Sequence, residues 1–227
     1  MIRIEAFVDR DAVADAAAKA LVLALRDADR PSLVATGGTT PGPTYDRLAK
    51  ADLDWGRLTV TLTDERFVDP SSPDSNERLI RQHLLVGPAA AARFLPLKNG
   101  RASPAEDAEV ADKALRVLEF FDAVLLGMGK DGHVASLFPG AAGLAEALDP
   151  RGAAFCIGVD MAGEEPRVPR ISLTLRALLD CGLIVLLTTG EEKRAVIERV
   201  AADATYAPPV AAILRQTETP VRILWAP

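Results

Sequence analysis

The residues of this chain best suited to chemistry are Asp131 and His133, which stand two positions apart in a glycine-rich segment. A histidine acts readily as a general base near neutral pH, and a nearby carboxylate can orient its ring and stabilise the charged form. The chain has only one other histidine, His83, which lies in a predicted helix and is expected at the surface or partly packed. Asp131 and His133 therefore predict proton transfer on a bound substrate, although an aspartate at this spacing also commonly caps a turn.

An apolar run over Phe121–Leu126 precedes this pair and ends at Gly127. Short apolar runs of this kind are typical of buried parallel strands. Gly127 and Gly129 allow the chain to turn sharply where the strand ends. Ligands of open α/β sheets bind beyond the carboxyl ends of the strands, so the segment is expected to reach a binding site.

A second glycine-rich segment, Thr36–Thr40, follows the predicted strand Ser32–Ala35 and precedes a helix that Pro41 begins. A strand, a glycine-rich turn and a helix start together favour anion binding, because backbone N–H groups and the helix dipole face the ligand. The pattern matches neither a Walker motif nor a dinucleotide fingerprint. It therefore predicts an anion site of no specified kind.

Other polar groups stand at the ends of predicted elements. Asp64–Arg66 follows the strand Leu58–Leu62, Arg170 begins an alternating strand, and Lys193 lies in the first turn of the helix Glu191–Ala204. A cation is unfavourable at a helix start, and a bound anion would offset this. Pairing of Lys193 with Glu191 or Glu192 on a solvated face is the simpler alternative.

The elements that position these residues alternate between strand and helix. Further strands are predicted at Phe94–Leu97, Phe155–Val159, Leu183–Leu187 and Val221–Trp225, and further helices at Asp9–Arg30, Asn76–Val86, Ser103–Glu119 and from Pro208 onward, with a loop at Met161–Pro169. This order predicts one α/β domain over residues 1–227, a doubly wound, mostly parallel sheet with helices on both faces.

The composition limits the partners. The chain has 227 residues, a formal net charge of −6 and 49% hydrophobic residues, which argues against nucleic acid or a membrane surface as the main partner. No apolar run is long enough to span a membrane, and the acidic start is unlike a signal peptide, so a cytoplasmic location is expected. Cys156 and Cys181 are expected to be buried thiols, and no metal-ligand spacing is present.

Four segments resemble the 6-phosphogluconolactonase family. Thr36–Pro41 resembles its S-G-G-[ST]-[ST]-P loop, and Asp64–Arg66 with Ser75-Asn76 resembles its D-E-R…S-N segment. Gly127–Gly140 resembles its G-x-G-x-D-G-H-x-A-S-L-F-P-G segment, which is the most specific, and Pro169–Thr174 resembles P-R-[IL]-[ST]-L-T. Thr36 and Val134 are small departures from serine and threonine.

The resemblance implies hydrolysis of 6-phospho-D-glucono-1,5-lactone in the oxidative pentose phosphate pathway without a cofactor. It implies a Rossmann-like fold shared with glucosamine-6-phosphate deaminase and ribose-5-phosphate isomerase. His133 would be the general base, with Asp131 and Asp64 beside it. The resemblance implies that the sugar phosphate is held by Gly37, Gly38, Thr39, Arg170 and Lys193. Thr40, Arg66 and Gly129 are further candidates for substrate binding.

Several questions stay open at this stage. The developing oxyanion could be stabilised by backbone N–H groups of residues 129–132 or by Arg66. A hexosamine-6-phosphate deaminase and a sugar-phosphate sensor without turnover are the rival functions. Ser136 is not part of a G-x-S-x-G elbow, so direct attack by water is expected. The state of assembly, a monomer or a small homo-oligomer, is left open.

Overall fold

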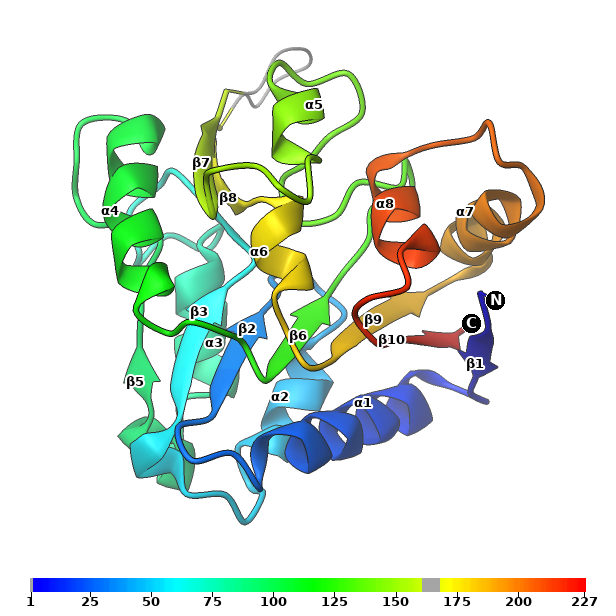
Figure 1. Ribbon diagram of the computed structural model, residues 1–227. Coiled ribbons are helices and arrows are strands. Elements are labelled where there is room, and N and C mark those ends of the chain that lie inside the picture. The colour runs from blue at the N-terminus through cyan, green and yellow to red at the C-terminus, as the bar shows by residue number, and fades with distance from the viewer. Residues whose placement is uncertain (1, 161–167) are drawn as a thin grey trace.

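The computed structural model describes residues 2–160 and 168–227, and its centre is a seven-stranded parallel sheet (Figure 1). The strands run in the order β1-β10-β9-β6-β2-β3-β5, and every neighbouring pair is parallel. Their bounds are β1 Ile4–Ala6, β2 Ser32–Ala35, β3 Thr59–Leu62, β5 Arg93–Phe94, β6 Ala123–Leu126, β9 Ile184–Thr189 and β10 Val221–Ala226.

The chain order creates a switch point between the neighbouring strands β2 and β6. From β2 the sheet grows through β3 to β5, and from β6 it grows in the other direction through β9 to β10. The segments that leave β2 and β6 therefore turn away from each other, and open a crevice at the carboxyl ends of the strands. Both glycine-rich segments of the sequence begin at this point.

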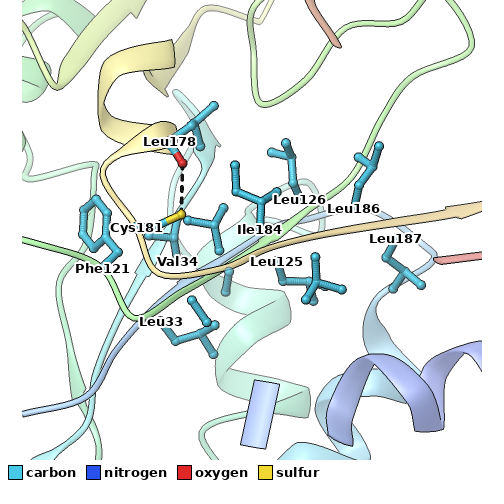
Figure 2. Close-up of a cluster of buried hydrophobic side chains, with 14 of the residues drawn as sticks. Leu33, Val34, Phe121, Leu125, Leu126, Leu178, Cys181, Ile184, Leu186 and Leu187 are labelled. Carbon is cyan, nitrogen blue, oxygen red and sulfur yellow. Dashed lines mark hydrogen bonds between the residues drawn. The ribbon is translucent and has the colours of Figure 1, made fainter. Parts of the chain in front are cut away.

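Helices cover both faces of the sheet. Figure 2 shows Leu125 and Leu187 pointing toward α1, whereas Leu126 and Leu186 point to the opposite face, on which α6 lies. This alternation follows from the period of two in a strand. The helices are α1 Arg10–Leu25, α2 Gly42–Leu48, α3 Asn76–His83, α4 Pro104–Arg116, α5 Leu144–Ala147, α6 Leu175–Leu179, α7 Glu191–Ala202 and α8 Pro209–Arg215.

A second, three-stranded antiparallel sheet lies beyond the carboxyl ends of β2 and β3 (Figure 1). It runs in the order β4-β8-β7, with β4 Asp64–Arg66, β8 Arg170–Leu173 and β7 Cys156–Val159. The predicted main sheet is confirmed, but the prediction did not include this small sheet. Asp64–Arg66 was expected only as a polar segment after a strand, and it is itself a strand.

Several predicted bounds were wrong. Helix α1 ends at Leu25 rather than Arg30, α3 ends at His83 rather than Val86, and α4 ends at Arg116 rather than Glu119. The sequence allowed either Ser75 or Asn76 to cap α3, and the structure shows Ser75 as the cap, since its hydroxyl accepts from the Arg78 N–H at 3.2 Å. Most of the predicted loop Met161–Pro169 lies outside the described residues. Within the described residues, no helix is both long and apolar enough to cross a membrane.

Candidate active site

A cavity of about 320 Å³ opens at the switch point, between the segments that follow β2 and β6. The two segments touch, since a side-chain carbon at Gly127 would lie 3.3 Å from the Thr36 hydroxyl oxygen. The remaining walls come from the small sheet, α3 and α7. The lining residues are Thr36–Pro41, Asp64, Arg66, Asn76, Gly127–Gly129, His133, Ala135, Phe138, Arg170, Leu187 and Lys193.

His133 is fixed by a carboxylate and an aromatic ring. Its Nδ1 lies 2.7 Å from Oδ1 of Asp131, and the same oxygen accepts from the His133 backbone N–H at 3.2 Å. The imidazole packs on Phe138 with ring centroids 4.4 Å apart. With Nδ1–H donating a hydrogen bond to the carboxylate, the lone pair of the neutral ring is on Nε2. The ring is 29% exposed, so this nitrogen can be reached by water or substrate.

The histidine loop, which we define as residues 127–138, is folded tightly around Gly129 and Gly132. The Gly129 N–H donates to the His133 carbonyl at 2.9 Å, and the Gly132 N–H donates to the Gly129 carbonyl at 3.1 Å. A Cβ atom at Gly129 would lie 2.2 Å from Nδ1 of His133. Gly132 has φ +80°, which favours glycine. The imidazole can therefore occupy its place only because position 129 lacks a side chain.

Glu65 organises the wall that α3 provides. Its carboxylate accepts from the backbone N–H of Arg66, Asn76 and Glu77 at 2.7–2.8 Å and from the Ser75 hydroxyl at 2.9 Å. Burial raises its pKa, and these four hydrogen bonds oppose that rise. With its oxygens engaged at the start of α3, Glu65 is suited to holding the wall in place and not to proton transfer.

Asn76, at the start of α3, was not singled out as a site residue, but its side chain lines the cavity. Its amide donates to the Asp64 carbonyl at 2.8 Å. Its side-chain oxygen lies where a Cβ atom at Gly37 would be, at 1.8 Å. Gly37 thus lets the glycine-rich segment after β2 close on α3. The adjacent Ser75-Asn76 pattern was the signal that could have found this residue.

Two arginines stand side by side in the small sheet. Arg66 on β4 and Arg170 on β8 are directly paired across the antiparallel strands. Burial lowers the pKa of Arg170, and the neighbouring Arg66 lowers it further. Like charges directly opposite one another destabilise a sheet. Since both residues line the cavity, this pair creates a positive wall that an anionic ligand would stabilise.

Lys193 forms a second positive wall, from the first turn of α7. Burial lowers the pKa of Lys193, and the positive charges of Lys130 and Arg10 lower it further. The expected alternative, pairing with a neighbouring glutamate, is not what the structure shows. Glu192 pairs with Lys130, and among the described residues Lys193 has no ion pair. Lys193 therefore remains a candidate ligand for an anion.

Asp64 lies on the floor of the cavity and is only 7% exposed. Its Oδ1 accepts from the Thr63 hydroxyl at 2.8 Å, and its Oδ2 accepts from the Ser136 hydroxyl at 2.6 Å. The structure thus brings all predicted site residues to one cavity, with Asp131 reaching it through His133. His83 lies outside this lining and is bonded to Asp46 at 2.8 Å.

Two further expectations concern sulfur and metal. Cys156 and Cys181 are free and buried, as predicted, and burial raises the pKa of Cys181 to about 12. Figure 2 shows the Cys181 thiol donating to the Leu178 carbonyl. Across residues 2–160 and 168–227, no cluster of three or more His, Cys, Asp or Glu side chains is arranged to hold a metal ion.

Comparison with known proteins identifies the family of this chain. The family described as glucosamine-6-phosphate isomerases/6-phosphogluconolactonase matches residues 8–225. A 6-phosphogluconolactonase of Caulobacter vibrioides is 48% identical, over 99% of this chain and 97% of its own length. The crystal structure of a 6-phosphogluconolactonase from Shewanella baltica has a TM-score of 0.93 and 34% identity, over 100% of this chain and 98% of that chain.

A more distant likeness concerns the fold alone. A monomeric glucosamine-6-phosphate deaminase has a TM-score of 0.80 at 17% identity, over 99% of this chain and 97% of that chain. The parallel sheet with helices on both faces is thus the fold that this deaminase shares, as the sequence predicted. Given the family match across almost the whole length, the chain belongs to the glucosamine-6-phosphate isomerase/6-phosphogluconolactonase family.

Proposed function

We propose that this protein is a 6-phosphogluconolactonase, a single-domain enzyme of the pentose phosphate pathway. It hydrolyses 6-phospho-D-glucono-1,5-lactone to 6-phospho-D-gluconate. The observation that carries the proposal is the His133–Asp131 pair in a cavity whose walls also present Arg66, Arg170 and Lys193. Hydrolysis of a phosphorylated lactone needs both features, because a base must take a proton from the attacking water and positive charge must bind the phosphate.

His133 takes a proton from water through Nε2, and the resulting hydroxide attacks the lactone carbonyl carbon. Asp131 stabilises the imidazolium that forms. When the tetrahedral intermediate collapses, the bond from the carbonyl carbon to the ring oxygen breaks, and the imidazolium returns its proton to that oxygen. The N–H groups of Gly129 and Gly132 already donate within the loop, which leaves the N–H groups of Lys130 and Asp131 and the side chain of Arg66 as the candidates to stabilise the oxyanion.

The phosphate is held by Arg170 and Lys193 together with Gly37, Gly38, Thr39 and Thr40. The two cations line the same cavity from different elements, Arg170 from β8 and Lys193 from α7, which suits the binding of a doubly charged group. Asp64 is a site residue whose two oxygens each accept a hydroxyl hydrogen. It is therefore better placed to orient groups at the cavity floor than to take a proton.

Turnover of freshly made lactone by wild type and by His133→Asn tests the proposal. General-base catalysis contributes roughly 10²–10⁴-fold, so kcat of the variant should fall by that factor while KM changes little. His83→Asn is the matched control, since His83 also bonds an aspartate through Nδ1 but lies outside the cavity lining.

Spontaneous opening of the lactone must be subtracted in each assay. A folded His133→Asn enzyme that keeps more than about a tenth of the wild-type kcat would contradict the general-base role. Ammonia release from glucosamine 6-phosphate, in place of lactone opening, would instead identify the deaminase activity. Binding of sugar phosphates with neither reaction would identify a sensor.

A further inference from the structure

We propose that Ser136 is a positioning residue for His133, and that it acts by fastening the histidine loop to the small sheet. Ser136 lies in the histidine loop three residues after His133 and is 0% exposed. It does not line the cavity, so it does not touch the substrate. The inference rests on the proposed function only in giving His133 the role of the base.

Ser136 fastens the loop at two points. Its hydroxyl donates to Oδ2 of Asp64 at 2.6 Å, and its backbone N–H donates to the Ser172 hydroxyl oxygen at 3.1 Å. Both partners are buried. The hydrogen bond to Asp64 is the shorter of the two, at 2.6 Å against 3.1 Å, so the contact with Asp64 is the main fastening.

The partners of Ser136 belong to the same strands as the two arginines. Asp64 and Ser172 are paired across β4 and β8, and the next pair on the same face is Arg66 with Arg170. Residues two apart in a strand share a face. Ser136 therefore rests on one cross-strand pair while the adjacent pair forms the positive wall. This contact holds the histidine loop, which carries the base, against the small sheet, which carries the two arginines.

The backbone between His133 and Ser136 is conformationally restricted. Val134 is fully buried and forms an isolated bridge with Leu137, whose N–H donates to the Val134 carbonyl at 2.9 Å. Ala135 has φ +49°, a conformation that a non-glycine residue adopts only where its surroundings impose it. A shift of Ser136 would thus be passed along the backbone to the imidazole.

The kinetic experiment compares Ser136→Ala with Thr63→Val. Both variants remove one hydroxyl donor to Asp64, but Thr63 is adjacent to Asp64 in the chain and does not hold the histidine loop. Because a displacement of about 1 Å can cost 10²-fold in rate, kcat of Ser136→Ala should fall by about 10–100-fold, with KM within about threefold. Thr63→Val should lower kcat by much less.

A second readout observes His133 without turnover. The chain has two histidines, so their Cε1–H nuclear magnetic resonance signals can be assigned by substitution. The His133 ring lies 4.4 Å from Phe138, whose ring current makes this signal sensitive to position. In Ser136→Ala the His133 signal should move or broaden while the His83 signal stays in place. In Thr63→Val neither should change.

Ser172→Ala removes the second fastening, the hydrogen bond from the Ser136 N–H to the Ser172 hydroxyl. This variant replaces Ser136→Ala in the experiment if Ser136→Ala does not fold. It should displace the His133 signal in the same direction. A folded Ser136→Ala enzyme with an unmoved His133 signal and a wild-type kcat would overturn the proposal. Equal losses of kcat in Ser136→Ala and Thr63→Val would also overturn it, because Ser136 would then matter only as a partner of Asp64.

The two proposals fail in different measurements. If His133 is not the base, His133→Asn keeps its activity, whereas displacement of the His133 signal in Ser136→Ala does not depend on that result. If Ser136 has no positioning role, the signal stays unmoved although His133→Asn is inactive.

Discussion

At the scale of single residues, the site depends on a glycine, Gly129, because any side chain at that position would collide with the catalytic pair. Gly129 leaves room for the imidazole of His133, and a methyl group there would lie 2.2 Å from Nδ1 and 2.6 Å from Oδ1 of Asp131. No real Cβ atom approaches so closely, so the ring or the loop would have to move. The glycine therefore fixes the place of the base as much as the aspartate does.

We expect Gly129→Ala to fold and to lose about 10²-fold in kcat, since the base would be misplaced by an ångström or more. Steady-state kinetics on the lactone would measure the loss. Gly56→Ala is the control, because a Cβ atom at Gly56 would meet only a 3.6 Å contact with Asp54. Wild-type kcat in a folded Gly129→Ala enzyme would show that the loop adapts at no cost to catalysis.

At the scale of elements, the starts of α3 and α7 each have a charged side chain beside them. Glu65, on β4, accepts from two backbone N–H groups of α3, from the Ser75 hydroxyl and from the Arg66 N–H. Lys193 puts a cation in the first turn of α7, where the helix dipole disfavours it. The first arrangement stabilises the fold, and the second is favourable only when an anion is bound.

Glu65→Gln should lower the free energy of unfolding by about 1–3 kcal/mol. The substitution replaces one carboxylate oxygen by an NH2 group, which cannot accept a hydrogen bond from the N–H groups of α3. Chemical denaturation measures this loss. The variant should also raise KM, since Asn76 and Arg66 are adjacent to the displaced carboxylate. Glu109→Gln on the exposed side of α4 should change neither quantity. An unchanged unfolding midpoint for Glu65→Gln would contradict the capping role.

Lys193→Met should stabilise the ligand-free protein, raising Tm by about 1–4 °C, while weakening the binding of 6-phosphogluconate. The sign of the pH dependence follows from the lowered pKa of Lys193. Below its folded-state pKa the amine is charged in both states, so the unfavourable interactions are fully present. As pH rises from the folded-state pKa toward the ordinary lysine value, only the unfolded state keeps the proton, and wild-type stability rises.

The gain in Tm from Lys193→Met should therefore be largest near neutral pH and shrink in alkaline solution. Differential scanning calorimetry at several pH values measures it. Lys19→Met is the control, because Lys19 is exposed and paired with Asp15, and such pairs contribute little. A lower Tm for Lys193→Met at neutral pH would contradict this account.

At the scale of the whole molecule, the sequence predicts most strands of the main sheet but not how the small sheet is formed. Short continuous apolar runs reveal β2, β6 and β9 because these strands are buried on both faces, whereas β1 was not predicted. Strands were predicted where β7 and β8 lie, but not that they pair with β4 in a separate sheet. Strand β4 is Asp64–Arg66, three charged residues whose pairing depends on β8, more than a hundred positions later. Its composition carries no strand signal, so only the fold reveals it.

The same limit applies to the site. Residues such as His133 and Arg170 could be found from the sequence, because they lie in segments that resemble the motifs of the family. Asn76 and Ser136 could not be assigned roles, since these depend on contacts between segments that are distant in the chain. The short helices α5 and α6 were missed for a further reason, because four or five residues show no helical period.

The paired arginines and Lys193 have a practical consequence for work in solution. A small cavity with concentrated positive charge in a protein of net charge −6 will take up whichever small dianion is abundant. We expect inorganic phosphate to compete with the lactone, so that the apparent KM rises linearly with phosphate concentration while kcat stays constant. Arg170→Ala should weaken this inhibition. Affinities measured in phosphate or sulfate buffers would describe the exchange of one anion for another, and only weakly coordinating buffers would report the affinity of the enzyme for its substrate.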